Sequence, residues 1–341
     1  MRRLLPVEAV PGPRFVEALR QAWDGGDAVL PIDPRLPAPA ARALVEALDV
    51  ERPVEDGDAL VVATSGTTGE PKGAVLTHDA VRASAEATSA RLAVDPDADR
   101  WLSCLPLAHI GGLAVVTRAL LTGTPLTFDE SEPATLVSLV GTQLRRMDVG
   151  RFRMVVLGGS TPPEDRPANT VVTYGMTETG SGLVYDGVPL DGVEVRAVGG
   201  ELHVRGPMLL RGYRDGTDPR DADGWLATGD AGTVTDGVVH VDGRLGDVIV
   251  TGGEKVWPDA VERVLRRLPS VADVAVTGRP DPEWGSRVVA WVVAGAVVPN
   301  LDELRDAVKA ELPPWCAPKE LVLVDDLPRT ALGKVRRRAL P

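Results

Sequence analysis

The chain has 341 residues, 44% of them hydrophobic and 25% charged, and its formal net charge at pH 7 is −12. This length fits two or three globular domains, and the acidic charge disfavours a nucleic acid or an anionic membrane as the partner. The two cysteines, Cys104 and Cys316, lie far apart without CxxC spacing, which argues against a disulfide framework or a zinc site and favours a reducing, cytoplasmic setting.

Strand-like and helical segments alternate between about residues 59 and 175, after an N-terminus that lacks the apolar core of a signal peptide. Short apolar runs predict strands at 59–64, 101–107, 153–159 and 170–175. Helices are predicted at 78–92, 112–123 and 133–146. Such alternation is typical of a mainly parallel α/β sheet, whose ligands lie at the carboxyl ends of the strands.

The remainder of the chain changes its rhythm twice. Residues 183–243 form short alternating strands ended by Gly and Asp, which predict a small antiparallel β subdomain. After Leu245, helices predicted at 258–268 and 300–312 mix with valine-rich strands, the longest of which is too short to span a bilayer. We therefore predict an N-terminal domain of residues 1–244 and an α+β C-terminal domain of residues 245–341.

The first of the predicted strands leads into TSGTTGEPKG at residues 64–73. Its hydroxyls and unhindered backbone N–H groups would cradle phosphate oxygens, and Lys72 adds a mobile positive charge. The stretch is not a Walker A loop, because Pro71 stands where the second glycine should be and Gly73 where the Ser or Thr should be. On composition alone, a flexible surface turn remains an equal alternative.

Four further motifs follow in order. YGMTETG presents Glu178, a hard oxygen ligand for Mg²⁺, and LATGD presents Asp230, which could accept hydrogen bonds from ribose hydroxyls. GRLGD contains Arg244, and PRTALGKVRRR contains Lys334. Taken singly, Glu178 and Asp230 are explained as turn residues and Lys334 as part of a basic tail.

The order and spacing of these five motifs, from residue 60 to 338, resemble the adenylate-forming superfamily of acyl- and aryl-CoA synthetases, peptide-synthetase adenylation domains and luciferases. The resemblance implies that a carboxylate attacks the α-phosphorus of ATP, giving an acyl-adenylate and pyrophosphate. A thiol, usually that of CoA, then displaces AMP. It also implies Mg²⁺ as cofactor, and a small mobile C-terminal domain that closes for the first step and rotates for the second.

The resemblance further implies roles for individual residues. Lys334 would reach the carboxylate and the α-phosphate, Thr177 would lie near the α-phosphate, and Glu178 would hold Mg²⁺. The phosphate and nucleotide residues would be Thr64, Ser65, Gly66, Thr67, Thr68, Gly69, Lys72, Gly158, Gly159, Ser160, Tyr174, Gly175, Met176, Asp230 and Arg244. The CoA-facing residues would be Gly252, Gly253, Glu254 and Trp257. Gly246 stands at the hinge, where the family commonly has a charged residue, and glycine still allows the backbone to turn.

PLAHIGGL at residues 106–113 resembles the substrate motif of the superfamily, which would put His109 at the pocket wall; the alternative is a hydrogen-bonded structural histidine. The motif lacks the aspartate that pairs with an α-amine, which argues against an amino acid. The short chain and PIDPRLPAPAARALVEAL at 31–48 resemble the compact o-succinylbenzoate–CoA ligases of menaquinone biosynthesis. Arg118 and Ser181 are candidates for binding the second carboxylate of that substrate.

Two other functions remain open. The chain could be another aryl- or fatty-acyl-CoA ligase, or an adenylate-binding protein that has lost catalysis, although Glu178 and Lys334 argue against such a loss. Only about 58 residues precede the first motif strand, so any site parts that the family's longer N-terminal region supplies are in doubt. The expected partners are a small carboxylic acid, ATP and CoA, without nucleic acid or membrane insertion, and the sequence leaves a homodimer open.

Overall fold

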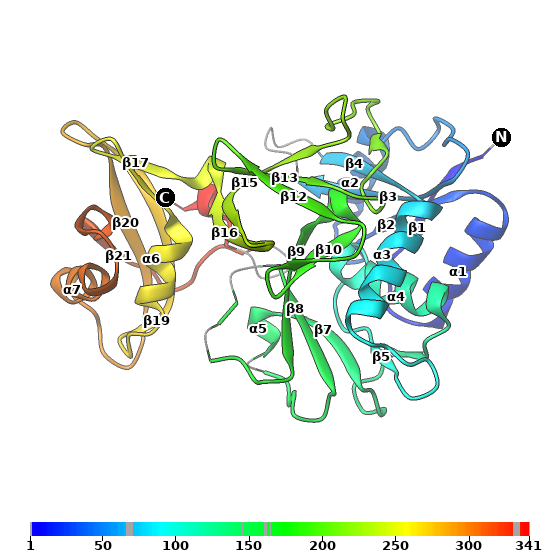
Figure 1. Cartoon of the computed structure of the whole chain (residues 1–341), viewed down its shortest axis with the longest axis horizontal. Coiled ribbons are helices and arrows are strands. Elements are labelled where there is room, and N and C mark those ends of the chain that lie inside the picture. Colours follow the sequence, from blue (N-terminus) through cyan, green and yellow to red (C-terminus); the bar gives the residue numbers. More distant parts are fainter. Residues whose placement is uncertain are drawn as a thin grey trace. The chain divides into compact units, whose positions relative to one another are not determined.

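The computed structural model describes residues 2–65, 71–144, 146–159, 162–163, 165–329 and 335–340, apart from the side chains of Ser65 and Arg338 (Figure 1). The chain forms two compact units. The first unit comprises Met1–Val195, Val204–Leu226 and Asp236–Val239, and the second comprises Arg196–His203, Ala227–Thr235 and His240–Pro341.

The first sheet of the first unit has five strands in the order β1-β2-β3-β4-β14. Its strands are β1 (Leu4–Glu8), β2 (Ala28–Ile32), β3 (Asp58–Ser65), β4 (Pro71–Thr77) and β14 (Gly212–Tyr213). The first three strands are parallel, whereas β4 runs antiparallel to β3 and β14 antiparallel to β4. Helices α1 (Pro13–Asp24) and α2 (Ala38–Ala47) complete this N-terminal segment.

The second sheet has seven strands and is mainly parallel, as predicted. Its strands, in spatial order, are β11 (Val188–Pro189), β10 (Ser181–Tyr185), β9 (Thr170–Met176), β8 (Met154–Gly158), β7 (Leu136–Val140), β5 (Trp101–Leu102) and β6 (Leu126–Thr127). Strands β10 and β11 at one edge are antiparallel. The carboxyl ends of β8 and β9 therefore lie side by side.

One predicted helix, at 133–146, is wrong. Residues 136–140, LVSLV, form the interior strand β7 between β8 and β5, and only the single turn α5 (Gly141–Leu144) is helical. Four consecutive residues of β7 are buried, which leaves no polar face for an amphipathic helix and suits a parallel strand covered on both sides. The strand predicted at 101–107 shortens to β5, Trp101–Leu102.

Helices α3 (His78–Arg91) and α4 (Ile110–Thr122) confirm the two other helix predictions in this region. Thr77 caps α3 by accepting a hydrogen bond from the backbone N–H of Ala80 at 3.1 Å, and Gly123 ends α4 in a left-handed conformation. Helix α3 contacts strands of both sheets, and it packs along α4. The pair thereby links the five-stranded sheet to the seven-stranded one.

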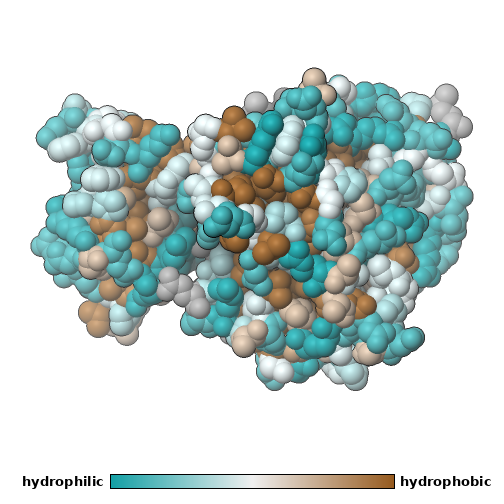
Figure 2. Space-filling view, viewed as in Figure 1, coloured by the Kyte–Doolittle hydropathy of each residue, from teal (hydrophilic) through white to brown (hydrophobic). Residues whose placement is uncertain are grey.

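The predicted antiparallel subdomain forms a four-stranded sheet, β12-β13-β15-β16. Its strands are β12 (Glu194–Val198), β13 (Glu201–Arg205), β15 (Leu226–Thr235) and β16 (Val238–Arg244). Figure 2 shows hydrophobic residues gathered in patches among hydrophilic ones on one face. The exposed Val198 and Val241 belong to the four-stranded sheet.

The second unit continues through a 3-10 turn, η2 (Leu245–Asp247), into an α+β fold, as predicted. Its elements are β17 (Ile249–Thr251), β18 (Glu254–Val256), α6 (Pro258–Leu265), β19 (Val271–Asp281), β20 (Gly285–Ala294), α7 (Leu301–Glu311), η3 (Pro314–Cys316), β21 (Glu320–Leu323) and η4 (Arg337–Ala339). Helices α6 and α7 cover one face of the β19-β20-β21 sheet. Leu327, Val335 and Leu340 from the C-terminal segment pack on the other face.

The valine-rich run at 288–298 lies largely in β20, and Val288, Val289, Ala290 and Val292 have no exposed surface. It is therefore a buried strand, as predicted. In the part of the chain that the structure describes, every helix is too short or too polar to cross a membrane.

Candidate active site

The turn that carries Glu178 joins β9 to β10. Gly175 must be a glycine, because a Cβ there would lie 2.1 Å from the carbonyl oxygen of Ser181 on the facing strand. The fully buried Thr179 closes the turn: its hydroxyl accepts a hydrogen bond from Met176 N at 2.9 Å and donates one to the Ser181 carbonyl at 2.7 Å. These contacts fix η1 (Thr177–Thr179) and the carboxylate at its centre.

The carboxylate of Glu178 is held by a tyrosine from β14. Oε1 accepts a hydrogen bond from the Tyr213 hydroxyl at 3.0 Å, and the backbone carbonyl of Glu178 accepts one from Leu210 N at 2.7 Å. Burial, together with the charge of Glu178, raises the pKa of Tyr213 well above its usual range. The phenol is therefore a protonated donor at neutral pH.

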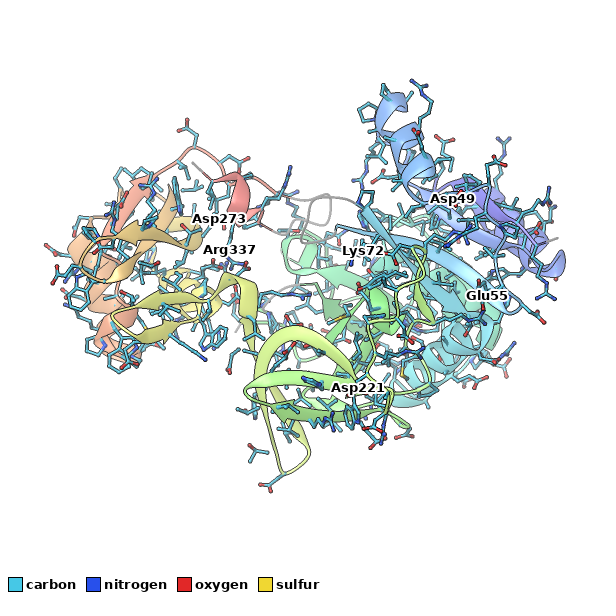
Figure 3. The ribbon with its side chains drawn as sticks, turned by 90° about the horizontal axis from the view of Figure 1, so that it is seen from above. Asp49, Glu55, Lys72, Asp221, Asp273 and Arg337 are labelled. Carbon is cyan, nitrogen blue, oxygen red and sulfur yellow. The ribbon has the colours of Figure 1, made fainter. Side chains whose placement is uncertain are left out.

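Lys72 lies on β4, next to β14 (Figure 3). Its Nζ is 4.9 Å from the centroid of the Tyr213 ring, a cation–π contact. Thr64 faces Lys72 in the antiparallel β3–β4 pairing, and the Thr64 hydroxyl donates to the Lys72 carbonyl at 3.3 Å. Gly73 has no room for a side chain, since a Cβ would lie 2.7 Å from Val61 Cγ1.

The glycine loop thus joins two antiparallel strands, instead of leading from a strand into a helix. Ser65 pairs with Pro71 at the end of the β3–β4 ladder. Of the other residues assigned to phosphate binding, Gly66, Thr67, Thr68 and Gly69 lie outside the described residues, as do Ser160 and Lys334.

Three of the four proposed adenine residues, Gly158, Gly159 and Tyr174, lie at or near the carboxyl ends of β8 and β9. A Cβ at Gly158 would be 3.1 Å from Thr173 Cγ2, which keeps the two strands in close contact. Gly159 continues the chain in a left-handed conformation with φ of 85°. Tyr174 lies on β9, directly before Gly175 and the turn with Glu178.

Asp230 and Arg244, assigned to the ribose, form an ion pair in the second unit. Arg244 Nε is 2.9 Å from Asp230 Oδ1, and Arg244 Nη1 donates to the Thr228 carbonyl at 3.0 Å. The Asp230 side chain is only 7% exposed, whereas that of Arg244 is 43% exposed. Gly246, two residues later, is exposed, and a Cβ there would meet nothing within 4 Å.

The substrate motif places His109 at the N-terminus of α4. Burial lowers the pKa of His109, and its Nε2 is buried without a hydrogen-bond partner among the described residues. The imidazole is therefore neutral at neutral pH. Gly112 lets the helix start here, since a Cβ would lie 2.4 Å from the Pro106 carbonyl.

Arg118, further along α4, is a buried charge. The residue is 2% exposed, its guanidinium stacks on Trp101 at 4.9 Å, and burial lowers its pKa. Its Nε and Nη1 are buried without a hydrogen-bond partner among the described residues. Ser181, the other candidate for the second carboxylate, stands at the start of β10 with φ of 144°.

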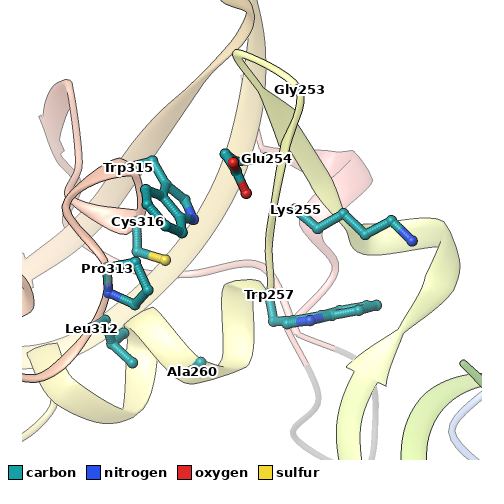
Figure 4. Close-up of a pocket in the computed structure, with 9 residues that line it drawn as sticks. All are labelled: Gly253, Glu254, Lys255, Trp257, Ala260, Leu312, Pro313, Trp315 and Cys316. Carbon is teal, nitrogen blue, oxygen red and sulfur yellow. The ribbon is translucent and has the colours of Figure 1, made fainter.

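A cavity of about 500 Å³ lies within the second unit (Figure 4). It is lined by Gly253, Glu254, Lys255, Trp257, Ala260, Leu312, Pro313, Trp315 and Cys316. Three of the four residues predicted to face CoA are in this lining. The fourth, Gly252, instead packs against Trp284 and donates its N–H to the Trp284 carbonyl at 2.8 Å.

Sequence reasoning missed the opposite wall of this cavity. Trp315 and Cys316 come from η3, about sixty residues after the β17–β18 hairpin, and Figure 4 shows them across the pocket from Glu254 and Trp257. The signal in the sequence was the tryptophan in PPWCAP. In the structure Trp315 is 41% exposed, as expected of a residue that lines a binding surface.

The single carboxylate at Glu178 suits magnesium better than a metal whose ligands all come from the protein. Within the described ranges there is no group of three or more His, Cys, Asp or Glu residues that could hold a metal ion. Glu178 offers one carboxylate, whose Oε2 makes no hydrogen bond or ion pair with any described residue. Magnesium is commonly held by one or two carboxylates with water and substrate phosphates, so Glu178 suits it.

Comparison with known proteins gives two family matches, an AMP-binding enzyme over residues 16–214 and an AMP-binding enzyme C-terminal domain over residues 260–334. A relative from Mycobacterium tuberculosis, named probable 2-succinylbenzoate–CoA ligase, is 39% identical over 96% of this chain and 94% of its own length. The o-succinylbenzoate CoA synthetase MenE of Bacillus subtilis, solved with the acyl-adenylate OSB-AMP, superposes with a TM-score of 0.77 at 28% identity, covering 95% of this chain and 80% of MenE. Its complex with ATP and a magnesium ion gives 0.76 at 29% identity, covering 95% and 81%.

The chain belongs to the AMP-binding enzyme family. This confirms the adenylate-forming class that the five ordered motifs predict. Within that class, the resemblance to the compact o-succinylbenzoate–CoA ligases is confirmed as well.

Proposed function

We propose that the chain is an ATP-dependent, AMP-forming ligase that joins 2-succinylbenzoate to CoA through an acyl-adenylate. Relatives that carry this name align over nearly the whole chain, and the related MenE structures contain the acyl-adenylate or ATP with magnesium. The reducing cytoplasm is the proposed setting, since ATP and CoA are its co-substrates and the two cysteines are free thiols.

In the first step, the residues around Glu178 bind and orient the nucleotide. Lys72 and the hydroxyls of the glycine loop stabilise the β- and γ-phosphates as the leaving group, while Lys334 stabilises charge at the carboxylate and α-phosphate. Glu178 would hold magnesium, which would neutralise charge on the phosphate oxygens. Holding two anionic reactants in line removes much of the entropic barrier.

In the second step, the C-terminal domain turns about Gly246 and offers its other face. The cavity beside Glu254 has a volume of about 500 Å³ and two tryptophans, Trp257 and Trp315, in its lining, which suits part of CoA. The neutral His109 lies at the start of α4, and in this proposal it would line the path between acid and thiol without adding charge. The thiol of CoA displaces AMP from the acyl-adenylate, and the product is the CoA thioester.

The observation that carries the choice of substrate is the buried guanidinium of Arg118. A buried cation without a hydrogen-bonding partner costs several kcal/mol, on the order of the penalties measured for unpaired buried charges. A substrate with a second carboxylate would relieve that cost. Neither a benzoate nor a fatty acid offers such a group, so Arg118 favours a dicarboxylic acid.

The test is pyrophosphate release over a panel of acids, with and without CoA, for the wild type and Arg118→Met. We expect release with 2-succinylbenzoate, a thioester product when CoA is added, and a KM for 2-succinylbenzoate at least tenfold higher in Arg118→Met, following from the loss of a charged hydrogen bond. Benzoate should show no such difference between wild type and variant.

The alternatives give different results. Release with benzoates or fatty acids but not with 2-succinylbenzoate would indicate another acyl-CoA ligase. No release with any acid would indicate an adenylate-binding protein without catalysis.

A further inference from the structure

Tyr213 has no role among the site residues assigned above, yet it touches two of them. Its hydroxyl bonds Glu178 Oε1 at 3.0 Å, and its ring lies 4.9 Å from Lys72 Nζ. We propose that Tyr213 is a positioning residue for adenylation, which holds the magnesium-binding carboxylate with its hydroxyl and the pyrophosphate-binding lysine with its ring. The proposal rests on the proposed function, because it takes Glu178 and Lys72 as the groups that meet magnesium and phosphate.

The hydrogen bond to Glu178 leaves one carboxylate oxygen for the metal. Tyr213 engages Oε1, and Oε2 has no partner among the described residues. With Oε1 held, the carboxylate cannot rotate freely, so less side-chain entropy is lost when a cation binds.

The contact with the Tyr213 ring positions the ammonium group of Lys72. In the described part of the chain Lys72 has no salt bridge, and its ammonium group lies over the Tyr213 ring. A carboxylate in place of the ring would compete with phosphate for the ammonium group, and its charge would repel the phosphate. An aromatic face attracts the cation electrostatically but leaves its N–H donors for the ligand.

Strand pairing and hydrogen bonds hold the backbone around Tyr213. Strand β14 pairs with β4 so that Tyr213 stands opposite Ala74, and Tyr213 N donates to the Thr217 carbonyl at 2.7 Å. The next residue, Arg214, donates its backbone N–H to the Gly73 carbonyl at 2.7 Å. Its guanidinium is buried and bonds the carbonyls of Leu48, Asp49, Arg52 and Pro53.

The same segment also fixes the backbone of Glu178, since Leu210 N donates to the Glu178 carbonyl at 2.7 Å. Residues 210–214 therefore connect the turn after β9 to the strand that carries Lys72. Through Tyr213, the positions of the carboxylate and the ammonium group are set by a single short stretch of backbone.

The experiment is equilibrium binding of ATP by titration calorimetry, with Mg²⁺ and in EDTA, for wild type, Tyr213→Phe and Tyr213→Leu. Tyr213→Phe keeps the ring and loses the hydroxyl, so binding with Mg²⁺ should weaken about tenfold while binding in EDTA stays unchanged. Tyr213→Leu loses both contacts, so binding in EDTA should weaken as well.

The matched control is Tyr185→Phe, which removes the hydroxyl of a buried tyrosine of the first unit, whose OH lies 3.3 Å from Thr88 Oγ1. It should leave both affinities unchanged. The proposal would be overturned if Tyr213→Phe weakened ATP binding equally with and without Mg²⁺, or did not weaken it at all. It would also be overturned if the wild type bound ATP equally under both conditions. A wild type that binds Mg·ATP but activates no acid refutes the proposed ligase and leaves the role of Tyr213 intact.

Discussion

Replacing Arg337 with Gln should destabilise the second unit more than any surface change. The guanidinium of Arg337 pairs with Asp247 of η2 at 3.0 Å and with two carboxylates of α6, Asp259 and Glu262, the latter at 2.8 Å. It thereby connects three segments: the 3-10 turn η2, helix α6, and the C-terminal stretch that follows Lys334.

The magnitude follows from how exposed each partner is. Glu262 is 2% exposed, so its charge would be left buried, and losing one partner of a buried pair costs about 3–5 kcal/mol. Arg266, which lies 2.6 Å from Glu262, still pairs with that carboxylate in the variant and keeps the loss of stability near the lower end of this range. Asp247 and Asp259 are about 30% exposed, so solvent screens their share. We expect a loss of about 3 kcal/mol, which in a unit of this size lowers Tm by roughly 12 °C or more.

The assay is thermal unfolding of the full chain, with the transition of the second unit followed by tryptophan fluorescence. Arg267→Gln is the matched control, because Arg267 pairs with Glu311 on the surface of the same unit, where both side chains are more than 40% exposed. That variant should lose about 1 kcal/mol or less.

The pH dependence gives a second check. Burial raises the pKa of Glu262, and removing Arg337, whose charge lowers it, raises the pKa further. When the pKa of a carboxyl is higher in the folded state than in the unfolded state, protonation stabilises the folded state. The loss of unfolding free energy in Arg337→Gln should therefore shrink as the pH falls from 8 to 5. A loss below 1 kcal/mol at pH 8, or one that grows at low pH, would refute the reasoning.

Three further predictions concern the hinge, the pocket and a thiol. Gly246→Pro should slow thioester formation relative to pyrophosphate release, because proline fixes φ, while Gly246→Ala, for which there is room, should not; equal rates of both half-reactions in the proline variant would count against a hinge there. Ala260→Phe should fill part of the second unit's cavity and raise the KM for CoA several-fold without changing adenylation, so an unchanged KM would exclude this cavity as the CoA site. Burial raises the pKa of Cys104 to about 11, so its alkylation in a Cys316→Ala variant should rise about tenfold per unit between pH 8 and 10, and a plateau below pH 9 would contradict this.

The sequence predicts those parts of the fold and site that local pattern determines. The apolar periodicity located β3, α3 and α4 to within a few residues, and the motif around Glu178 identified a turn whose glycines are required by close backbone contacts. β7 was misassigned because a short apolar run fits a buried strand or a buried helix equally, and only its place in the sheet decides.

The missed residues depend on partners far along the chain. Tyr213 meets Glu178 across 35 residues, and a lone tyrosine before an arginine gives no local sign of that contact. Arg337 looked like part of a basic tail, but it is enclosed by three carboxylates that lie 75 to 90 residues earlier. Arg118, in contrast, was named as a candidate from the sequence, but the periodicity of its apolar helix indicates burial and not whether its charge is paired.

The cavity beside Trp315 is built entirely by residues of the second unit, from Gly253 to Cys316. In the proposed two-step mechanism, the shape of the cavity therefore stays the same while that unit turns. A ligand bound there would stay bound to the unit while it turns and would move with it. The order in which adenylate and thiol arrive would then be set by the rotation, and not by the opening of a pocket.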